Sequence, residues 1–233
     1  MNNLNENLER FGIFISKDKI SKFKNYSSFL KEYNKKVNLT SIIDPEEIAE
    51  KHFIDSLLII KTIKIKGSVI DVGSGAGFPG VPLKIFDPQL ELTLLESCNK
   101  KICFLTELSK KIDVKFTTIK TRAEVAAHQD NLREKFENCT ARALAPLNIL
   151  CELCLPFVKK EGFLISMKGP NYVNEITAAE KSLQTMGGEI QTVKNFTLSN
   201  SQSERNIIII KKIKSTPSAF PRSYSKIKNK PLI

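Results

Sequence analysis

The sequence predicts an α/β fold, in which a mostly parallel sheet of seven strands carries helices on both faces and follows a group of N-terminal helices. Short β-branched runs alternate with helical segments after residue 67, as expected for parallel strands joined by crossover helices. The first run leads into a glycine-rich turn. A short polar link at 197–205 separates the last two runs, which predicts a terminal hairpin and one antiparallel strand.

The N-terminal region, residues 1–66, is expected to be helical. Apolar residues within 18–37 recur at intervals of three and four, the pattern of an amphipathic helix. After a polar break, Asp44 can cap a second helix, with Pro45 in its first turn and Glu47 completing a capping box. We expect this helix to run to about residue 64.

The alternating part of the chain begins at residue 68. The candidate strands are 68–72, 90–95, 114–118, 138–141, 163–167, 190–196 and 206–212. The candidate helices between them are 79–86, 98–111, 145–158 and 172–186. We therefore expect a helical region at 1–66, a central domain at 67–213 and a basic tail at 214–233, which folds only on RNA or on the domain body.

Length and composition describe a globular protein. The chain has 233 residues, enough for one α/β domain with a small appendage. Its 41% hydrophobic and 26% charged residues are ordinary for soluble domains. No apolar stretch approaches the length of a membrane span, and the first ten residues lack the pattern of a signal peptide. We expect a cytoplasmic protein that does not enter a membrane.

The net charge of +11 is unevenly distributed. The last stretch, 211–233, contains basic residues and no acidic one, and lysines are also concentrated at 17–36. Such an excess favours a polyanionic partner, although a merely soluble surface would have the same composition.

The five cysteines do not indicate a metal site. Cys151 and Cys154 form the one C-x-x-C pair, and the chain has only two histidines, a poor supply for structural zinc. Their helical spacing in an apolar run predicts buried small hydrophobic residues.

The most informative motif is the glycine loop at 69–80, which reads Val-Ile-Asp-Val-Gly-Ser-Gly-Ala-Gly-Phe-Pro-Gly. Gly73, Gly75 and Gly77 allow positive φ angles and let a ligand lie against bare backbone, and the helix that follows offers free N–H groups. The spacing from Gly75 to Gly80 also fits a dinucleotide fingerprint, so the loop alone does not identify its ligand.

Two acidic residues indicate a nucleoside cofactor, and one of them favours S-adenosylmethionine over a dinucleotide. Asp71 lies just before the loop, where a carboxylate suits the cationic amino group of a bound amino acid and would repel a pyrophosphate. Glu96 ends the next strand, where its two oxygens suit the ribose hydroxyls of either cofactor. The alternative for Asp71 is an acid that braces the loop. The alternative for Glu96 is a solvated strand end.

Residues after the later strands complete the expected rim. Ala123 and Glu124 follow the third strand and are placed to meet an adenine through their backbone groups. Arg142 and Lys168 end the fourth and fifth strands, and ligands of open α/β sheets bind at this edge.

These motifs resemble those of the bacterial ribosomal RNA small-subunit methyltransferase G family, also called glucose-inhibited division protein B. The matching stretches are 38–41, 52–56, 71–83, 94–97, 100–101, 104–105, 122–124, 141–143 and 168–169. The extension Gly-Phe-Pro-Gly-Val-Pro-Leu is far more specific than a generic glycine loop. In departures from the family pattern, Glu137 and Glu96 stand where other members have aspartate, and the tail lacks the glycine expected after Arg222.

The resemblance implies a Rossmann-like class I methyltransferase fold. It also implies methyl transfer from S-adenosylmethionine to N7 of a guanine in 16S ribosomal RNA, with that RNA or the small ribosomal subunit as partner. By analogy, the cofactor contacts would be Gly73, Phe78, Ala123, Glu124 and Arg142.

Guanine N7 has an in-plane lone pair and no proton, so we expect no general base and no metal. We assign Arg142 to positioning of the cofactor or backbone, and Lys168 to an RNA phosphate. His52 and Asp55 share a helix face and either buttress that helix or line the guanine pocket. The alternatives are an NAD(P)-dependent oxidoreductase, a non-catalytic RNA-binding protein, and a methyltransferase of small molecules or proteins.

Overall fold

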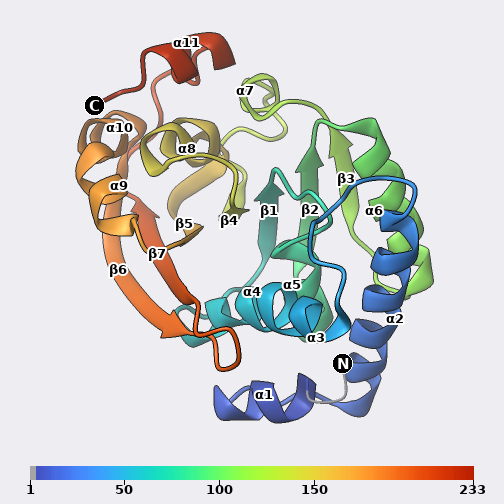
Figure 1. Cartoon of the computed structure of the whole chain (residues 1–233). Helices are drawn as coiled ribbons and strands as arrows, with labels where there is room; N and C mark the ends of the chain where they lie inside the picture. The colour runs from blue at the N-terminus through green and yellow to red at the C-terminus, as the bar shows by residue number, and fades with distance from the viewer. Residues whose placement is uncertain (1–3) are drawn as a thin grey trace.

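The computed structural model describes residues 4–233 and contains a seven-stranded sheet in the order β3-β2-β1-β4-β5-β7-β6 (Figure 1). The strands are β1 (Ser68–Val72), β2 (Glu91–Glu96), β3 (Thr117–Lys120), β4 (Phe136–Arg142), β5 (Val158–Lys168), β6 (Gly188–Thr197) and β7 (Glu204–Lys212). β7 pairs antiparallel with β5 and β6, and the pairings among β1 to β5 are parallel. The mostly parallel sheet and its terminal hairpin are thus confirmed.

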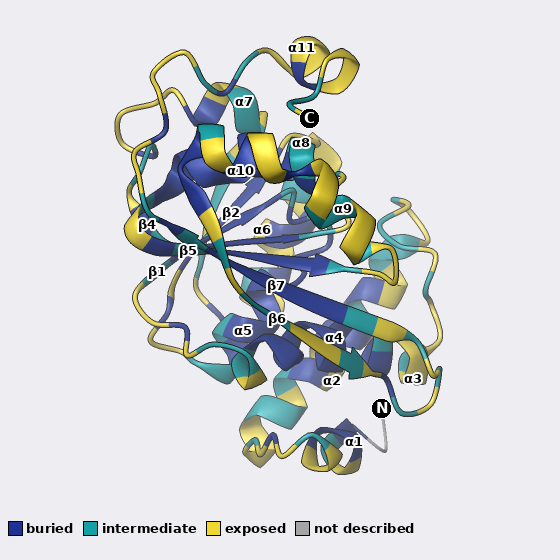
Figure 2. Cartoon of the chain, turned by 90° about the vertical axis from the view of Figure 1, so that its left-hand side faces the viewer, coloured by how far each residue is buried: buried dark blue, intermediate teal, exposed yellow. Residues whose placement is uncertain are grey.

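Helices cover both faces of this sheet (Figure 2). On one face lie α1 (Leu4–Arg10), α2 (Lys17–Asn34), α3 (Pro45–Ile48), the π-helix η1 (Ala49–Ile54), α4 (Asp55–Leu57), the 3-10 helix η2 (Leu58–Lys61), α5 (Gly80–Phe86) and α6 (Asn99–Lys111). On the other lie α7 (Ala123–Ala126), α8 (Leu147–Cys154), the 3-10 helix η3 (Leu155–Phe157), α9 (Tyr172–Ala178), α10 (Glu180–Met186) and α11 (Tyr224–Asn229).

The hydrophobic core is divided by the sheet, because successive residues of a strand point to opposite faces. Ile207 and Ile209 of β7 pack with the N-terminal helices, while Ile208 and Ile210 pack with the α8 side. The first cluster includes residues from both 4–65 and 69–209, so the N-terminal helices and the sheet share one core. The division into three domains stays a prediction. Cys151 and Cys154 are buried in the second cluster, as predicted.

Several predicted boundaries were wrong. β3 begins at Thr117 instead of 114, because Asp113 adopts a positive φ and the Val114 N–H donates to Ser109 O at the end of α6. β5 begins five residues early, at Val158. The single helix predicted at 172–186 is divided at Ala179 into α9 and α10.

The helix that begins after Asp44 is capped as predicted: Asp44 Oδ1 accepts from the backbone N–H groups of Glu46 and Glu47 at 2.9 and 3.0 Å. It ends at Lys61, near the predicted residue 64, but its hydrogen-bond pattern changes along its length. Residues 49–54 are π-helical, and π-helical turns are frequent at functional sites.

The basic tail, 214–233, is folded on the domain body, which was one of the two predicted alternatives. The Arg133 guanidinium donates to the carbonyls of Thr216, Pro217 and Phe220. Ile227 of α11 is fully buried against the α8 side. α11 consequently lies beside α7 and α8 (Figure 1).

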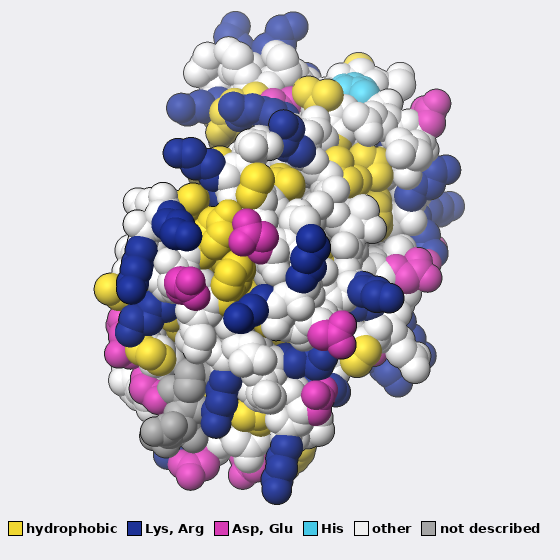
Figure 3. Space-filling model, turned by 90° about the vertical axis from the view of Figure 1, so that its right-hand side faces the viewer, with side chains coloured by type: hydrophobic (Ala, Val, Ile, Leu, Met, Phe, Trp, Pro, Cys, Tyr) yellow, Lys and Arg dark blue, Asp and Glu magenta, His cyan; other side chains and the backbone are white. Residues whose placement is uncertain are grey.

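Basic side chains outnumber acidic ones on the surface that carries α2 and α6 (Figure 3). Acidic side chains are interspersed among them, so this surface is a mixed one with a basic excess. Within residues 4–233, no helix is both long and apolar enough to cross a membrane.

Candidate functional site

Two adjacent hollows lie at the carboxyl edge of the sheet, and Ala143 and Leu144 line both. The glycine-loop cleft has a volume of about 290 Å³ and is lined by Val72, Gly73, Leu95, Glu96, Ser97, Lys101, Thr121, Arg122, Ala123, Glu124, Ala143, Leu144, Leu153 and Tyr224. The arginine cavity has a volume of about 530 Å³ and is lined by Ile42, Lys51, His52, Asp55, Arg142, Ala143, Leu144, Ala145, Pro146, Met167, Lys168, Gly169, Glu175 and Arg205.

The glycine loop turns sharply after β1. Gly73, Gly75 and Gly77 have φ angles of 71°, 58° and 95°, the left-handed region that the sequence predicted. The Gly73 N–H donates to Leu95 O at 2.8 Å, which ties the start of the loop to the end of β2. Gly73 lines the cleft, so its bare backbone faces the space a ligand would take.

Asp71 braces this loop from behind the cleft. Its side chain is fully buried, with Oδ1 accepting from Thr140 Oγ1 at 2.8 Å and Oδ2 from the Gly80 N–H at 3.2 Å. Burial raises the pKa of Asp71 to about 6, against the lowering effect of these hydrogen bonds. Asp71 does not line the cleft. Its contacts are those of a bracing acid, and a contact with the amino group of a cofactor stays a prediction.

Glu96 lies in the cleft wall, where the sequence predicted it. Oε2 accepts from the Gly75 N–H at 3.0 Å and Oε1 from the Cys98 N–H at 2.8 Å. Lys101 Nζ lies 3.8 Å from Oε2. Ala123 and Glu124, at the start of α7, line the same cleft, so four of the predicted cofactor residues, Gly73 included, are brought together.

Phe78 and Gly77 face away from the cleft. The Phe78 ring is 5% exposed and stacks on His52, with centroids 4.5 Å apart, and on Tyr26, with centroids 5.3 Å apart. A Cβ at Gly77 would lie 2.7 Å from Tyr26 Oη. These residues, like Gly75, line neither hollow. They clamp the loop to α2, and a cofactor contact by Phe78 remains a prediction.

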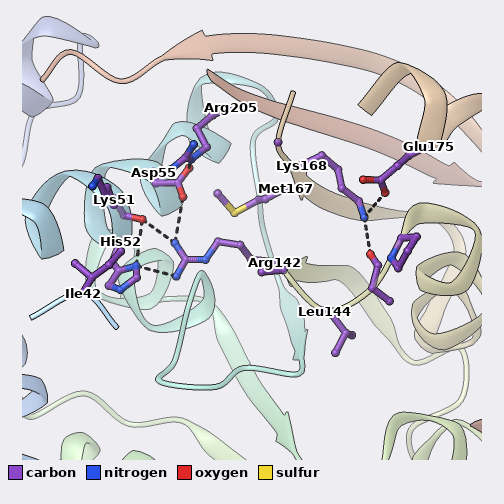
Figure 4. Close-up of a pocket in the computed structure, with 14 residues that line it drawn as sticks. Ile42, Lys51, His52, Asp55, Arg142, Leu144, Met167, Lys168, Glu175 and Arg205 are labelled. Carbon is purple, nitrogen blue, oxygen red and sulfur yellow. Dashed lines mark hydrogen bonds and ion pairs between the residues drawn. The ribbon is translucent and has the colours of Figure 1, made fainter. Parts of the chain in front are cut away.

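Arg142 joins β4 to the π-helix (Figure 4). Its Nη1 donates to Lys51 O at 3.0 Å and to Asp55 Oδ2 at 3.1 Å. The guanidinium carbon also lies 4.9 Å from the Phe78 ring centroid. The π-helix makes Lys51 O accessible, because the Asp55 N–H donates to the carbonyls five and three residues earlier. Arg142 therefore holds the wall of the arginine cavity in place.

His52 buttresses its helix, one of the two predicted alternatives, and it also lines the arginine cavity. A contact with guanine stays a prediction. Its Nδ1 lies 3.1 Å from Arg142 Nη2. Nδ1 also lies 3.1 Å from Lys51 O, and Nε2 lies 3.0 Å from Thr40 Oγ1, so both ring nitrogens have partners within the protein. Burial, followed by the charge of Arg142, lowers the pKa of His52 to about 3, and the ring is neutral at neutral pH.

Arg205 is a residue that the sequence reasoning missed. It enters the arginine cavity from β7, and its Nε lies 3.2 Å from Asp55 Oδ1 (Figure 4). Burial raises the pKa of Asp55, and Arg142 and Arg205 oppose this rise. Arg205 immediately precedes the predicted strand 206–212, and that position was the one available signal.

Lys168 is engaged within the protein. Nζ donates to Ala145 O at 2.6 Å and pairs with Glu175 Oε2 at 2.7 Å, and its side chain is 8% exposed (Figure 4). It fastens the segment after β4 to α9. The predicted phosphate contact stays a prediction and would require this ion pair to rearrange. Among residues 4–233, no three His, Cys, Asp or Glu side chains are grouped to hold a metal ion.

The chain is similar to known proteins over most of its length. The family model for rRNA small subunit methyltransferase G matches residues 19–208. Ribosomal RNA small subunit methyltransferase G from Acetivibrio thermocellus is 45% identical over 229 residues, which cover 97% of this chain and 94% of the relative. The protein of the same name from Clostridium tetani is 40% identical over 232 residues, covering 98% and 97%.

Solved structures share the fold at low sequence identity. The [4+2]-cyclase SpnF has a TM-score of 0.54 at 12% identity, over 69% of this chain and 82% of that one. The precorrin-6y C5,15-methyltransferase from Geobacter metallireducens has a TM-score of 0.51 at 15% identity, over 67% and 87%. These likenesses show the class I methyltransferase fold.

Proposed function

Because the chain belongs to the rRNA small subunit methyltransferase G family, we propose that it methylates N7 of one guanine in 16S ribosomal RNA. It is an S-adenosylmethionine-dependent rRNA methyltransferase, and the position of the methyl group is the proposed part. The observation that carries the proposal is the pair of hollows that meet at Ala143 and Leu144. One suits a nucleoside cofactor and the other a purine base.

The residues of the glycine-loop cleft fit S-adenosylmethionine. Glu96 has two carboxylate oxygens at the cleft wall, a suitable acceptor pair for two ribose hydroxyls. Ala123 and Glu124 would hold the adenine, and the bare backbone of Gly73 the methionine part. When bound, the cofactor supplies the electrophilic methyl group. Asp71 acts indirectly, by bracing the loop against α5.

The arginine cavity supplies position rather than proton transfer. His52 has a pKa of about 3, and both of its ring nitrogens are engaged within the protein, so it is poorly suited to serve as a general base. Asp55 is held between Arg142 and Arg205. An N7 lone pair needs no base, and in-line placement of the base against the methyl is the main requirement.

The basic surface, the tail included, suits the RNA backbone, and we propose that the substrate is 16S RNA within a small-subunit particle or its precursor. A base must be reachable before it can enter the cavity, so an unpaired segment is favoured over a duplex. Ribosome assembly would place the enzyme in the cytoplasm.

The test is transfer of labelled methyl from S-adenosylmethionine to small-subunit RNA from a strain that lacks the gene. We expect one N7-methylguanine, detected by borohydride and aniline cleavage, and no label on large-subunit RNA. Calorimetric titration with NADH serves as a second control, because an oxidoreductase would bind it. Tight RNA binding without methyl transfer would support the non-catalytic alternative and refute the proposal.

A further inference from the structure

The C-terminal tail contributes a side chain to the glycine-loop cleft. Tyr224, the first residue of α11, lines the cleft together with Ala123 and Glu124. Its ring is 39% exposed, and the Arg122 guanidinium carbon lies 5.8 Å from the ring centroid. An aromatic ring thus lies at the part of the cleft where the proposed function puts the adenine.

Three contacts fix the position of Tyr224. Two residues before it, Arg222 donates to the buried Glu152 carboxylate from its backbone N–H, Nε and Nη2 at 2.8, 2.9 and 2.7 Å. Three residues after it, Ile227 is fully buried. His128 Nε2 also lies 2.9 Å from Pro221 O. The ring is therefore carried by a docked segment, although it belongs to the last ten residues of the chain.

We propose that Tyr224 contacts the adenine of the bound cofactor by stacking, and that α11 forms the outer wall of the cofactor site. This inference rests on the proposed function and adds a binding residue that lies far from the glycine loop in sequence. Every base has a π-face, so an aromatic ring at the wall of a nucleoside site stabilises the bound base without a hydrogen bond. Arg122 and Tyr224 together would enclose the adenine end of the cleft.

The first test is calorimetric binding of S-adenosylmethionine to the full-length protein. Tyr224→Ala should weaken binding on the order of tenfold, within the range for removal of a base-stacking ring, whereas Tyr224→Phe should bind like the original protein. Phe14→Ala is the matched control, because Phe14 is 73% exposed and lies outside both hollows. Equal affinity in Tyr224→Ala and the original protein would overturn the inference.

The second test separates stacking from a merely structural role. The chain contains no tryptophan, so Tyr224→Trp introduces a single tryptophan at the cleft wall, whose emission is distinct from that of the tyrosines. S-adenosylmethionine and adenosine should quench its emission in a saturable way, and methionine, which lacks the base, should not. Phe14→Trp should respond to none of them.

The outcomes distinguish this inference from the proposed function. If the original protein binds S-adenosylmethionine and methylates RNA while Tyr224→Trp emission is unresponsive, α11 is not a wall of the cofactor site and the function stands. If the original protein binds no S-adenosylmethionine at all, both proposals fail. Quenching by adenosine in Tyr224→Trp, with a tenfold weaker Tyr224→Ala, supports the inference.

Discussion

Removing the Arg142 side chain should destabilise the whole fold, because this guanidinium links β4 to the π-helix. Arg142→Ala deletes the hydrogen bonds to Lys51 O and Asp55 Oδ2 and the contact with His52 Nδ1. It also leaves the Asp55 carboxylate, whose side chain is 4% exposed, with Arg205 as its remaining ion-pair partner among the described residues.

The expected loss of unfolding free energy follows from the burial of the Arg142–Asp55 ion pair. Breaking a buried ion pair by removing one partner costs roughly 3–5 kcal/mol. The Arg142 side chain is 16% exposed and Arg205 still faces Asp55, so we expect the low end, about 3 kcal/mol. For a chain of this length, such a loss lowers the melting temperature by about 6–12 °C.

Urea unfolding followed by circular dichroism measures this loss, with Arg205→Ala as the matched control. Arg205 makes one ion pair with Asp55 and its side chain is 24% exposed, so its removal should cost about 1 kcal/mol or less. Arg142→Lys should recover little, since an ammonium cannot reproduce the guanidinium fork. A loss below about 1 kcal/mol in Arg142→Ala, or equal losses in both alanine variants, would refute this reasoning. Unchanged cofactor binding and turnover in Arg142→Ala would also refute its positioning role.

Three further measurements probe other parts of the site. Gly77→Ala should lower the unfolding free energy by about 3 kcal/mol, since φ is 95° and the new Cβ would lie 2.7 Å from Tyr26 Oη. Gly75→Ala is its control: the new Cβ meets no atom closer than 3.9 Å, so the unfolding free energy should fall by about 1 kcal/mol. Because burial lowers the pKa of His52 to about 3, the unfolded chain binds a proton that the folded chain does not, so stability should fall as pH drops from about 6.5 to about 3. His52→Gln should flatten that decline in pH-dependent urea unfolding. Alanine substitution of three exposed tail lysines should reduce the salt dependence of 16S RNA binding by about two units of log–log slope, and an unchanged slope would exclude a tail contact with phosphates. These lysines are Lys226, Lys228 and Lys230.

Local periodicity and composition were sufficient to predict the sheet, its antiparallel strand and the glycine loop. These features depend on residues close together in sequence, such as the β-branched run before Gly73. The boundary errors arose where the local preference for a strand or helix conflicted with hydrogen bonds to neighbouring segments. Val114, for example, belongs to a strand-like run but completes the turn after α6.

The site was less predictable, because its geometry depends on distant partners. The sequence placed Glu96 and Glu124 at one edge, and both line the same cleft. The sequence could not show that Phe78 packs on Tyr26 and His52, because that contact depends on how α2 and the π-helix pack against the loop. A π-helical turn likewise has no composition that separates it from an α-helix.

The segment that begins at Arg142 connects the two hollows physically. Arg142 is held by the π-helix, and Ala145 O accepts from Lys168, so both ends of the segment are fixed. Between them, Ala143 has a φ of 52°, and Leu144 lies so close to Gly73 that an added Cβ would be 2.6 Å from Cδ1. Under the proposed function, a methyl group that passes from one hollow to the other would cross beside Leu144. Because methyl transfer depends on in-line placement, we expect the bonds at Arg142 and Lys168 to affect the reaction through this segment, even though neither residue lines the glycine-loop cleft.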